Sequence, residues 1–149
     1  MKTIGYAIVA LILFTQCTKE KRFENGIHGK WNIDRYQYYQ VHCSAGAKLI
    51  QEKKDFGTIK LTTKKYPSKV AYSTTDQQYI GYWTDENGNE TEFQYEYFEK
   101  LYGGFSLTFF FGGPSHVSIE ILTKNYWRMS MNTYFGGCEY DWFKYELSK

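Results

Sequence analysis

Proline, cysteine and excess charge are all scarce in this sequence. Two prolines and three cysteines occur in 149 residues, and 18 basic side chains stand against 16 acidic ones. A chain this close to neutral lacks the basic groove with which proteins bind nucleic acid backbones, so we expect no nucleic acid partner. The sequence also lacks histidine or cysteine pairs at metal-ligand spacing and a glycine-rich phosphate loop, so we predict no metal site and no cofactor.

Residues that could act together in catalysis are also missing. His42 and Cys43 are neighbours, but adjacent residues of a β-strand point to opposite faces and cannot form a pair of nucleophile and base. His28 is isolated, and Ser115-His116 does not lie in the strand, turn and helix arrangement that exposes a nucleophilic serine. We therefore predict that the protein is not an enzyme.

Aromatic residues, in contrast, are abundant. The 15 Tyr, 11 Phe and 4 Trp side chains suit the pleated, half-buried surfaces of β-sheets. Hydrophobic and polar residues alternate in segments separated by short turns, without the helices that connect parallel strands. We expect a single all-β domain, an antiparallel up-and-down β-barrel of eight or nine strands, because closing such a sheet removes its exposed edges.

Turn residues and alternation place the individual strands. Asn87-Gly88 marks the clearest hairpin turn, since both residues accept the positive φ values of a tight turn. Residues 44–55 show the only helical spacing, and we expect a short helix or a loop there. The expected strands are residues 29–43, 57–63, 70–72, 78–84, 92–98, 105–111, 117–121, 126–131 and 138–147.

The N-terminus has the composition of a signal sequence. Lys2 supplies a positive charge, residues 4–14 carry none, and Cys17 follows shortly after them. The uncharged segment is shorter than the about 20 residues that a transmembrane helix needs. The pattern resembles the lipobox of bacterial lipoproteins, whose cysteine is lipidated and becomes the first residue of the mature chain. We expect a lipoprotein signal peptide at residues 1–16, the lipidated Cys17 with a flexible tether at residues 17–28, and the barrel domain at residues 29–149.

The same resemblance implies a source and a location. The relaxed lipobox and the body rich in Tyr, Lys and Asn resemble lipoproteins of the Bacteroidetes. Lys19, which occupies the second position after the cysteine, favours the outer membrane by similarity to known lipoprotein sorting. We therefore expect the protein to be anchored in the outer membrane by lipid, on either its periplasmic or its outer face.

Closure of the barrel leads to a prediction about the other two cysteines. In a closed antiparallel barrel the first and last strands pair head to tail, so Cys43 at the end of the first strand should lie near Cys138 at the start of the last. The cell envelope permits disulfides. We expect a disulfide between Cys43 and Cys138, with two free thiols as the alternative.

The start of the first strand carries a family resemblance. Gly29-Lys30-Trp31 resembles the G-x-W motif of lipocalins, and residues 119–127 (IEILTKNYW) resemble the late hairpin of bacterial lipocalin-like domains. The resemblance covers about residues 27–148. It implies a barrel whose cup takes up small apolar molecules, with a tryptophan at the closed floor and an arginine, for which Arg128 is the candidate, over that tryptophan.

The orientation of the first strand decides whether the cup is polar or apolar. If alternation continues from Trp31, the side chains of Arg35, Gln37 and Tyr39 line the cavity and provide polar contacts for a ligand. Alternatively, a bend after Ile33 leaves Arg35 in solvent and turns Tyr36 and Tyr38 inward. The candidate cavity residues are Trp31, Arg35, Gln37, Tyr39, Phe93, Tyr95, Phe109 and Trp127.

Two functions are compatible with these observations. The first is a membrane-anchored lipocalin-like lipoprotein that binds a small apolar or amphipathic ligand without catalysis. The second is a lipoprotein with a filled barrel, which binds a protein or glycan partner through the surface aromatics Tyr36, Tyr38, Trp83 and Trp142.

Overall fold

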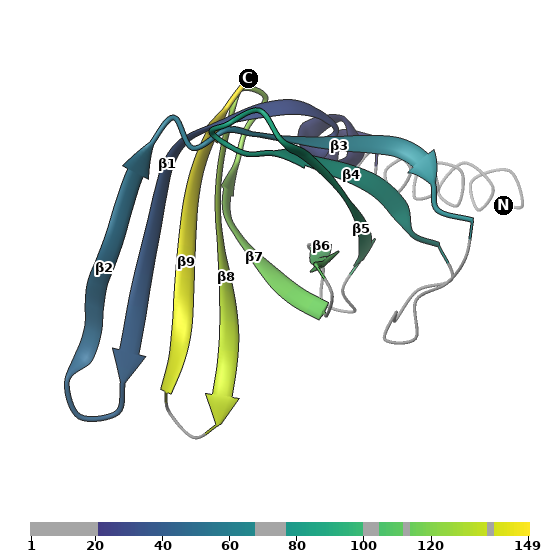
Figure 1. Cartoon of the computed structure of the whole chain (residues 1–149). Helices are drawn as coiled ribbons and strands as arrows, with labels where there is room; N and C mark the ends of the chain where they lie inside the picture. Colours follow the sequence, from purple (N-terminus) through teal and green to yellow (C-terminus); the bar gives the residue numbers. More distant parts are fainter. Residues whose placement is uncertain (1–20, 68–76, 100–104, 112–113, 137–138) are drawn as a thin grey trace, which may run out of the picture.

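The computed structural model describes residues 21–67, 77–99, 105–111, 114–136 and 139–149 (Figure 1). A short helix occupies residues 21–27 and is followed by β-strands. The strands are β1 (Gly29–His42), β2 (Gly46–Lys54), β3 (Thr58–Lys65), β4 (Tyr79–Thr84), β5 (Glu90–Glu99), β6 (Phe105–Phe110), β7 (Pro114–Leu122), β8 (Tyr126–Gly136) and β9 (Glu139–Ser148).

All strand pairs are antiparallel, and the sheet closes on itself. Its order is β2-β1-β3-β4-β5-β6-β7-β8-β9, with an additional pairing between β1 and β9. The start of β1, from Gly29 to Asn32, pairs with β3, whereas its later part, from Arg35 to His42, pairs with β2. Eight strands therefore form a closed barrel, and β2 is an extra strand beside β1 (Figure 1). The predicted all-β antiparallel barrel is confirmed.

The prediction of a helix or loop at residues 44–55 is wrong, because most of this segment forms β2. In the ladder with β1, Tyr38 pairs with Gln51 and Tyr39 with Leu49, so Ile50 is an extra residue in a β-bulge. The bulge interrupts the alternation, and Leu49 and Ile50 are each 44% exposed. The apparent helical spacing of this segment is the result of that irregularity.

The second half of the expected flexible tether is also structured. Residues 21–27 are helical, the Phe23 ring stacks on Phe105 at 4.0 Å, and Ile27 is fully buried. The backbone carbonyl of Ile27 accepts a hydrogen bond of 2.8 Å from the Trp31 indole N–H. These tertiary contacts attach the helix to one end of the barrel, which we call the closed end. Residues 1–20 and the expected strand at residues 70–72 lie outside the described residues.

The closed end is filled by a compact apolar core. Trp31 and Trp127 are fully buried and meet edge to face, with ring centroids 5.7 Å apart. Lys149 Nζ lies 4.4 Å from the centroid of the Trp31 ring. Each large buried side chain contributes about 1.5–3 kcal/mol of hydrophobic stabilisation. The other fully or almost fully buried side chains include Ile33, Ile59, Leu61, Tyr95, Leu107, Phe109, Met129 and Leu147.

The turn between β4 and β5 confirms the predicted hairpin and marks the opposite, open end of the barrel. The Asp85 carboxylate accepts hydrogen bonds from the backbone N–H groups of Asn87 and Asn89, at 2.9 and 2.8 Å. Gly88 takes a positive φ of 84°. Hydrogen bonds from Asn89, followed by those from Asn87, hold the pKa of the Asp85 carboxyl below its usual range.

Candidate functional site

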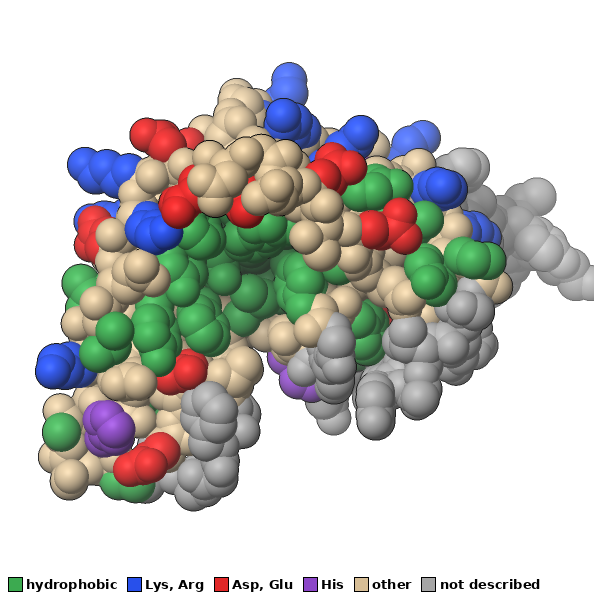
Figure 2. All heavy atoms as spheres, in the orientation of Figure 1, with side chains coloured by type: hydrophobic (Ala, Val, Ile, Leu, Met, Phe, Trp, Pro, Cys, Tyr) green, Lys and Arg blue, Asp and Glu red, His purple; other side chains and the backbone are tan. Residues whose placement is uncertain are grey.

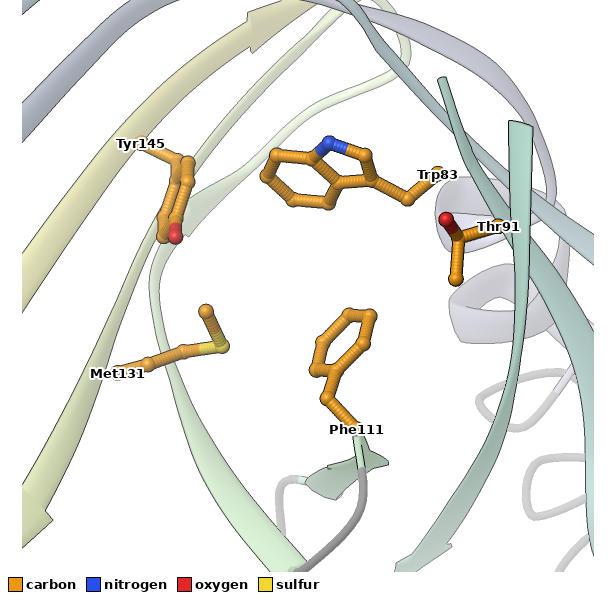
Figure 3. Close-up of a pocket in the computed structure, with 5 residues that line it drawn as sticks. All are labelled: Trp83, Thr91, Phe111, Met131 and Tyr145. Atoms are coloured by element: carbon orange, nitrogen blue, oxygen red, sulfur yellow. The ribbon is translucent and has the colours of Figure 1, made fainter. Parts of the chain in front are cut away.

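A pocket lies inside the barrel near the open end, above the packed core. Its cavity volume is about 300 Å³. The lining side chains come from strands on different sides of the barrel and converge on the same space (Figure 3). They are Trp83, Thr91, Phe111, Met131 and Tyr145.

Aromatic rings form the walls and floor of this pocket. The Trp83 ring meets Phe111 at 6.2 Å and Tyr145 at 5.7 Å, both nearly perpendicular. Phe93 is 3% exposed, and its ring centroid lies 4.6 Å from that of Phe111. The contact between these two rings separates the pocket from the core. Burial, together with the nearby Tyr36, raises the pKa of Tyr145 well above its usual range, so its hydroxyl remains neutral at physiological pH. The pocket is therefore apolar, with the hydroxyls of Thr91 and Tyr145 as polar groups.

The apolar lining continues from the pocket along the inner face of β1 and β9. Tyr36 stacks on Phe56 at 4.5 Å and lies 5.4 Å from Tyr145. Tyr38 stacks on Phe143 at 5.2 Å, and its hydroxyl donates a hydrogen bond of 3.0 Å to Asp141. Figure 2 shows the result: hydrophobic side chains gather in a hollow on this face of the molecule. The hollow gives the pocket a wide entrance.

The predicted polar lining from β1 is wrong, and the alternative bend after Ile33 is confirmed. In the ladder with β9, Ile33 pairs with Leu147 and Arg35 with Glu146, so Asp34 is an extra residue in a bulge. The bulge reverses the alternation of β1. Tyr36 is consequently 9% exposed and lies inside the barrel, whereas Arg35 points to the outer face.

Arg35, Gln37 and Tyr39 were predicted to bind a ligand. On the outer face they instead contact other side chains of the protein. Arg35 forms an ion pair of 3.0 Å with Glu52, and Gln37 donates a hydrogen bond of 3.1 Å to the same carboxylate. Hydrogen bonds from Gln37 and then Arg35 lower the pKa of the Glu52 carboxyl. Tyr39 lies 5.5 Å from Trp142. None of these three predicted residues lines the pocket.

The other predicted cavity residues point inward but belong to the core beneath the pocket. Trp31, Tyr95, Phe109 and Trp127 are fully buried, and Phe93 is nearly so. They fill the closed half of the barrel. Trp83 was expected at the surface only in the alternative of a filled barrel, and the other four lining residues were not among the predicted cavity residues. Phe111, Met131 and Tyr145 share the alternation of the inward rows, which was the signal available for them.

Lys149, and not the predicted Arg128, is the cation over the ring of Trp31. Arg128 lies on the outer face, where its Nε is 2.7 Å from a carboxylate oxygen of Glu120. Lys149, the last residue, instead places its ammonium over the Trp31 ring and donates a hydrogen bond of 3.4 Å to the carbonyl of Gly26. The prediction for Arg128 is therefore wrong, because the side chain of residue 128 alternates away from the inward Trp127 and Met129.

A group of partly buried polar side chains lies between the N-terminal helix and the barrel. The Tyr97 hydroxyl donates a hydrogen bond to Glu24, and its ring stacks on Tyr79 at 5.3 Å. His28 lies 6.0 Å from the Tyr97 ring and has a buried Nε2 without a hydrogen-bond partner. Burial lowers the pKa of His28, an effect that Glu24 partly offsets and Lys149 adds to. These contacts fix the helix to the barrel floor.

Neither a metal site nor a membrane-spanning helix is found in the described part of the chain. No three His, Cys, Asp or Glu side chains approach closely enough there to hold a metal ion. Within the same residues, no helix has the length and apolar character needed to cross a bilayer.

The pairing of β1 with β9 bears on the predicted disulfide between Cys43 and Cys138. Val41 pairs with Tyr140, as expected for the first and last strands of a closed barrel. Cys43 lies two residues beyond Val41 and is disulfide-bonded. Cys138 lies outside the described residues, so its pairing with Cys43 stays a prediction.

Comparisons with known proteins give similarity at the level of solved structures. No family model matches the chain, and no curated protein matches it. Apocrustacyanin C2 and lobster apocrustacyanin A1 each align with 89% of this chain and 65% of their own, at 14% identity and a TM-score of 0.44. H1 crustacyanin from the lobster Homarus americanus aligns with 80% of this chain and 58% of its own, at 15% identity and a TM-score of 0.38. This chain thus spans less than two thirds of each of these solved chains.

Proposed function

We propose that this protein is a non-catalytic, lipid-anchored lipoprotein of the outer membrane, of Bacteroidetes type, whose lipocalin-like barrel binds a small apolar or amphipathic molecule. The observation that carries the proposal is the apolar pocket of about 300 Å³ between Trp83, Phe111, Met131 and Tyr145. Small-molecule sites are typically concave, lined mostly by hydrophobic and aromatic groups, and supplied with a few polar contacts. This pocket has all three properties.

The volume and the lining restrict the ligand. A cavity of about 300 Å³ lies at the lower end of the range found for small-molecule sites, which favours a ligand of one or two rings or a short chain. The lining residues carry no charge, and the hydroxyls of Thr91 and Tyr145 suit a single polar group on that ligand. The wide apolar entrance toward Tyr36 and Tyr38 allows a longer apolar portion to extend along β1.

The positions of the aromatic residues favour binding of a small ligand inside the barrel over binding of a partner through surface aromatics. Of the four aromatics that would form such a surface, Tyr36, Tyr38 and Trp83 lie on the inner face of the barrel. Trp142 lies on the outer face, where the Lys144 ammonium is 3.8 Å from its ring centroid. The aromatic residues of the structure thus support an internal ligand more than a protein or glycan partner.

Native mass spectrometry of the mature protein, purified from its own membranes, tests ligand binding. We expect a bound species of higher mass than the polypeptide and its anchor, which is lost when the barrel is unfolded. A single unliganded mass, together with no binding of added apolar compounds, would contradict the proposal.

Metabolic labelling with a fatty acid analogue tests the anchor separately. We expect the wild-type chain to incorporate the label and the Cys17→Ser variant to remain unlabelled. Cys43→Ser is the matched control and should be labelled like the wild type, since that cysteine belongs to the barrel domain. Equal labelling of the Cys17→Ser variant would exclude Cys17 as the lipidation site.

A further inference from the structure

A second cleft lies at the closed end of the barrel, on the side at which the chain enters it. Its volume is about 500 Å³. One wall is the helix, with Arg22, Phe23 and Gly26, and the other is the end of β7 with the following turn, where Leu122 and Lys124 lie. The cleft has an apolar interior from Phe23 and Leu122, with cations at its rim.

The cations around this cleft have no acidic partners in the described part of the chain. Arg22 and Lys124 are exposed and form no ion pair with described residues. Lys149 lies close enough to Lys124 for the two charges to repel: burial, and to a lesser degree Lys124, lowers the pKa of the Lys149 ammonium. We call Arg22, Lys124 and Lys149 the closed-end cations. Positive charges that crowd together without acidic partners favour the approach of an anion.

Among the described carboxylates near this end, Glu120 is neutralised by a cation, whereas Glu24 is hydrogen-bonded and keeps its charge. Glu24 accepts a hydrogen bond from Tyr97, and Glu120 forms an ion pair with Arg128. At the open end the balance is reversed, because acidic residues surround the turn between β4 and β5 and Lys53 is paired with Glu86 at 2.8 Å. The acidic residues of that turn and the start of β5 are Asp85, Glu86, Glu90 and Glu92. The turn between β4 and β5 is thus an acidic part of the open end.

The chain length before the helix adds a spatial argument. Four Cα steps separate Cys17 from Lys21 at the start of the described helix, and a fully extended chain of this length spans at most about 14 Å. A lipid anchor on Cys17, which is part of the proposed function, would therefore hold the closed end within reach of the bilayer surface. Anionic headgroups attract each basic side chain near the surface with a free energy that corresponds to about a fivefold change in affinity.

We propose that the closed end of the barrel is a membrane-docking surface, in which the cleft between residues 22–26 and 122–124 accepts the phosphate headgroups of an anionic bilayer. Arg22 and Lys124 contact the phosphates, and Phe23 and Leu122 contact the apolar part of the interface. The acidic open end then points away from the membrane, and the ligand pocket opens toward the surrounding solvent.

Vesicle sedimentation with an unlipidated mature chain tests this proposal independently of the anchor. The chain begins at residue 17, contains every residue that the structure describes, and carries Cys17→Ser. We expect it to sediment with phosphatidylcholine vesicles that contain about 30% phosphatidylglycerol and not with phosphatidylcholine alone, with weaker binding as salt rises. Added inorganic phosphate at constant ionic strength should not release it, because docking needs a surface of headgroups and the apolar interface.

Two double variants distinguish vesicle binding through the cleft from a general effect of net charge. Arg22→Ala with Lys124→Ala should weaken vesicle binding about 30-fold, which corresponds to about 2 kcal/mol. Lys48→Ala with Lys54→Ala removes the same charge from β2 and should leave binding within about twofold of the unsubstituted chain.

Equal loss in both double variants, displacement by phosphate alone, or no binding to anionic vesicles would each overturn the docking surface. None of these results bears on the open-end pocket or on lipidation, which the experiments above test separately.

Discussion

The indole of Trp83 meets the ring of Tyr145 edge to face, with centroids 5.7 Å apart and an interplanar angle of 81°. The two residues lie on β4 and β9, which are not adjacent in the sheet, so this contact spans the interior of the barrel. Below it the core is filled by Phe93 and its neighbours, and beside it a cavity of about 300 Å³ remains. The contact therefore lies at the boundary between the packed half and the open half of the molecule.

The orientation of β1 can be tested by comparing two neighbouring residues. Tyr36 is 9% exposed and contacts Phe56, Phe143 and Tyr145, so Tyr36→Ala should lower the free energy of unfolding by about 3 kcal/mol. Arg35→Ala should leave the unfolding midpoint almost unchanged, because its ion pair with Glu52 is exposed to solvent. Urea unfolding measures both. Greater destabilisation by Arg35→Ala would favour the unbent strand.

Gly57 occupies a position that other residues cannot take without strain. Its φ is +102°, and a Cβ atom added there would lie 2.0 Å from the backbone carbonyl oxygen of Thr84. Gly57→Ala should therefore lower the free energy of unfolding by about 3 kcal/mol or more. Gly46→Ala is the matched control, since Gly46 also has a positive φ, of +74°, but has no atom within 4 Å of the added Cβ. Its cost should be about 1 kcal/mol, and equal costs would contradict the described contact between Gly57 and β4.

His28 should make the barrel less stable in mild acid. Burial lowers its pKa in the folded protein below the ordinary value of 6.5, although Glu24 acts in the opposite direction. Between the two values the unfolded chain binds the proton more readily than the folded one, so stability falls as the pH drops through about 6.5 and is fully present above it. Thermal unfolding between about pH 8 and pH 5 should show a smaller decrease for His28→Gln than for the wild type. Identical pH profiles would show that His28 is not protected from protonation.

The predicted bond between Cys43 and Cys138 would close a loop of about 95 residues. Its reduction should lower the free energy of unfolding by about 4–5 kcal/mol in the chain-entropy model. Peptide mapping without reduction should find the peptides of Cys43 and Cys138 linked, and the double variant Cys43→Ser with Cys138→Ser should no longer respond to reductant. Separate peptides under non-reducing conditions would refute this pairing.

Much of the architecture could be predicted because alternation and turn chemistry are local properties. Trp31, which precedes the bulge of β1, and Ile59, Phe93 and Phe109 all occupy inward positions of alternating segments, and all are buried. Asn87-Gly88 similarly predicts the hairpin between β4 and β5. Closure then follows from the need to satisfy strand edges, and the pairing of β1 with β9 confirms it.

The errors occur where a single extra residue changes the alternation. Asp34 and Ile50 each occupy a bulge, and nothing in their residue types distinguishes them from regular strand positions. The first bulge moves Arg35 and Gln37 out of the barrel, and the second hides β2 from a search for alternation. The helix at residues 21–27 depends on contacts of Phe23 and Ile27 with distant strands, which a local pattern does not contain.

The pocket itself depends on side-chain volumes from several strands at once. Phe93 on β5 and Phe111, directly after β6, both line the interior, yet Phe93 is 3% exposed in the core and Phe111 is 41% exposed at the pocket. The packing of side chains from β4, β5, β8 and β9 across the interior decides which part of the barrel, along its axis, is filled. Alternation gives the face of a residue but not its height along the barrel.

Dye binding to two variants of β5 tests ligand binding in the open-end pocket most directly. Thr91 lines the pocket, so Thr91→Trp fills the cavity, whereas Glu92→Trp adds the same ring at the next residue, which points outward and pairs with Tyr82. An anilinonaphthalene sulfonate dye should bind the wild type and Glu92→Trp at one saturable site, and bind Thr91→Trp at least about tenfold more weakly. Equal binding to all three proteins, or no saturable binding to the wild type, would contradict a ligand site in this pocket.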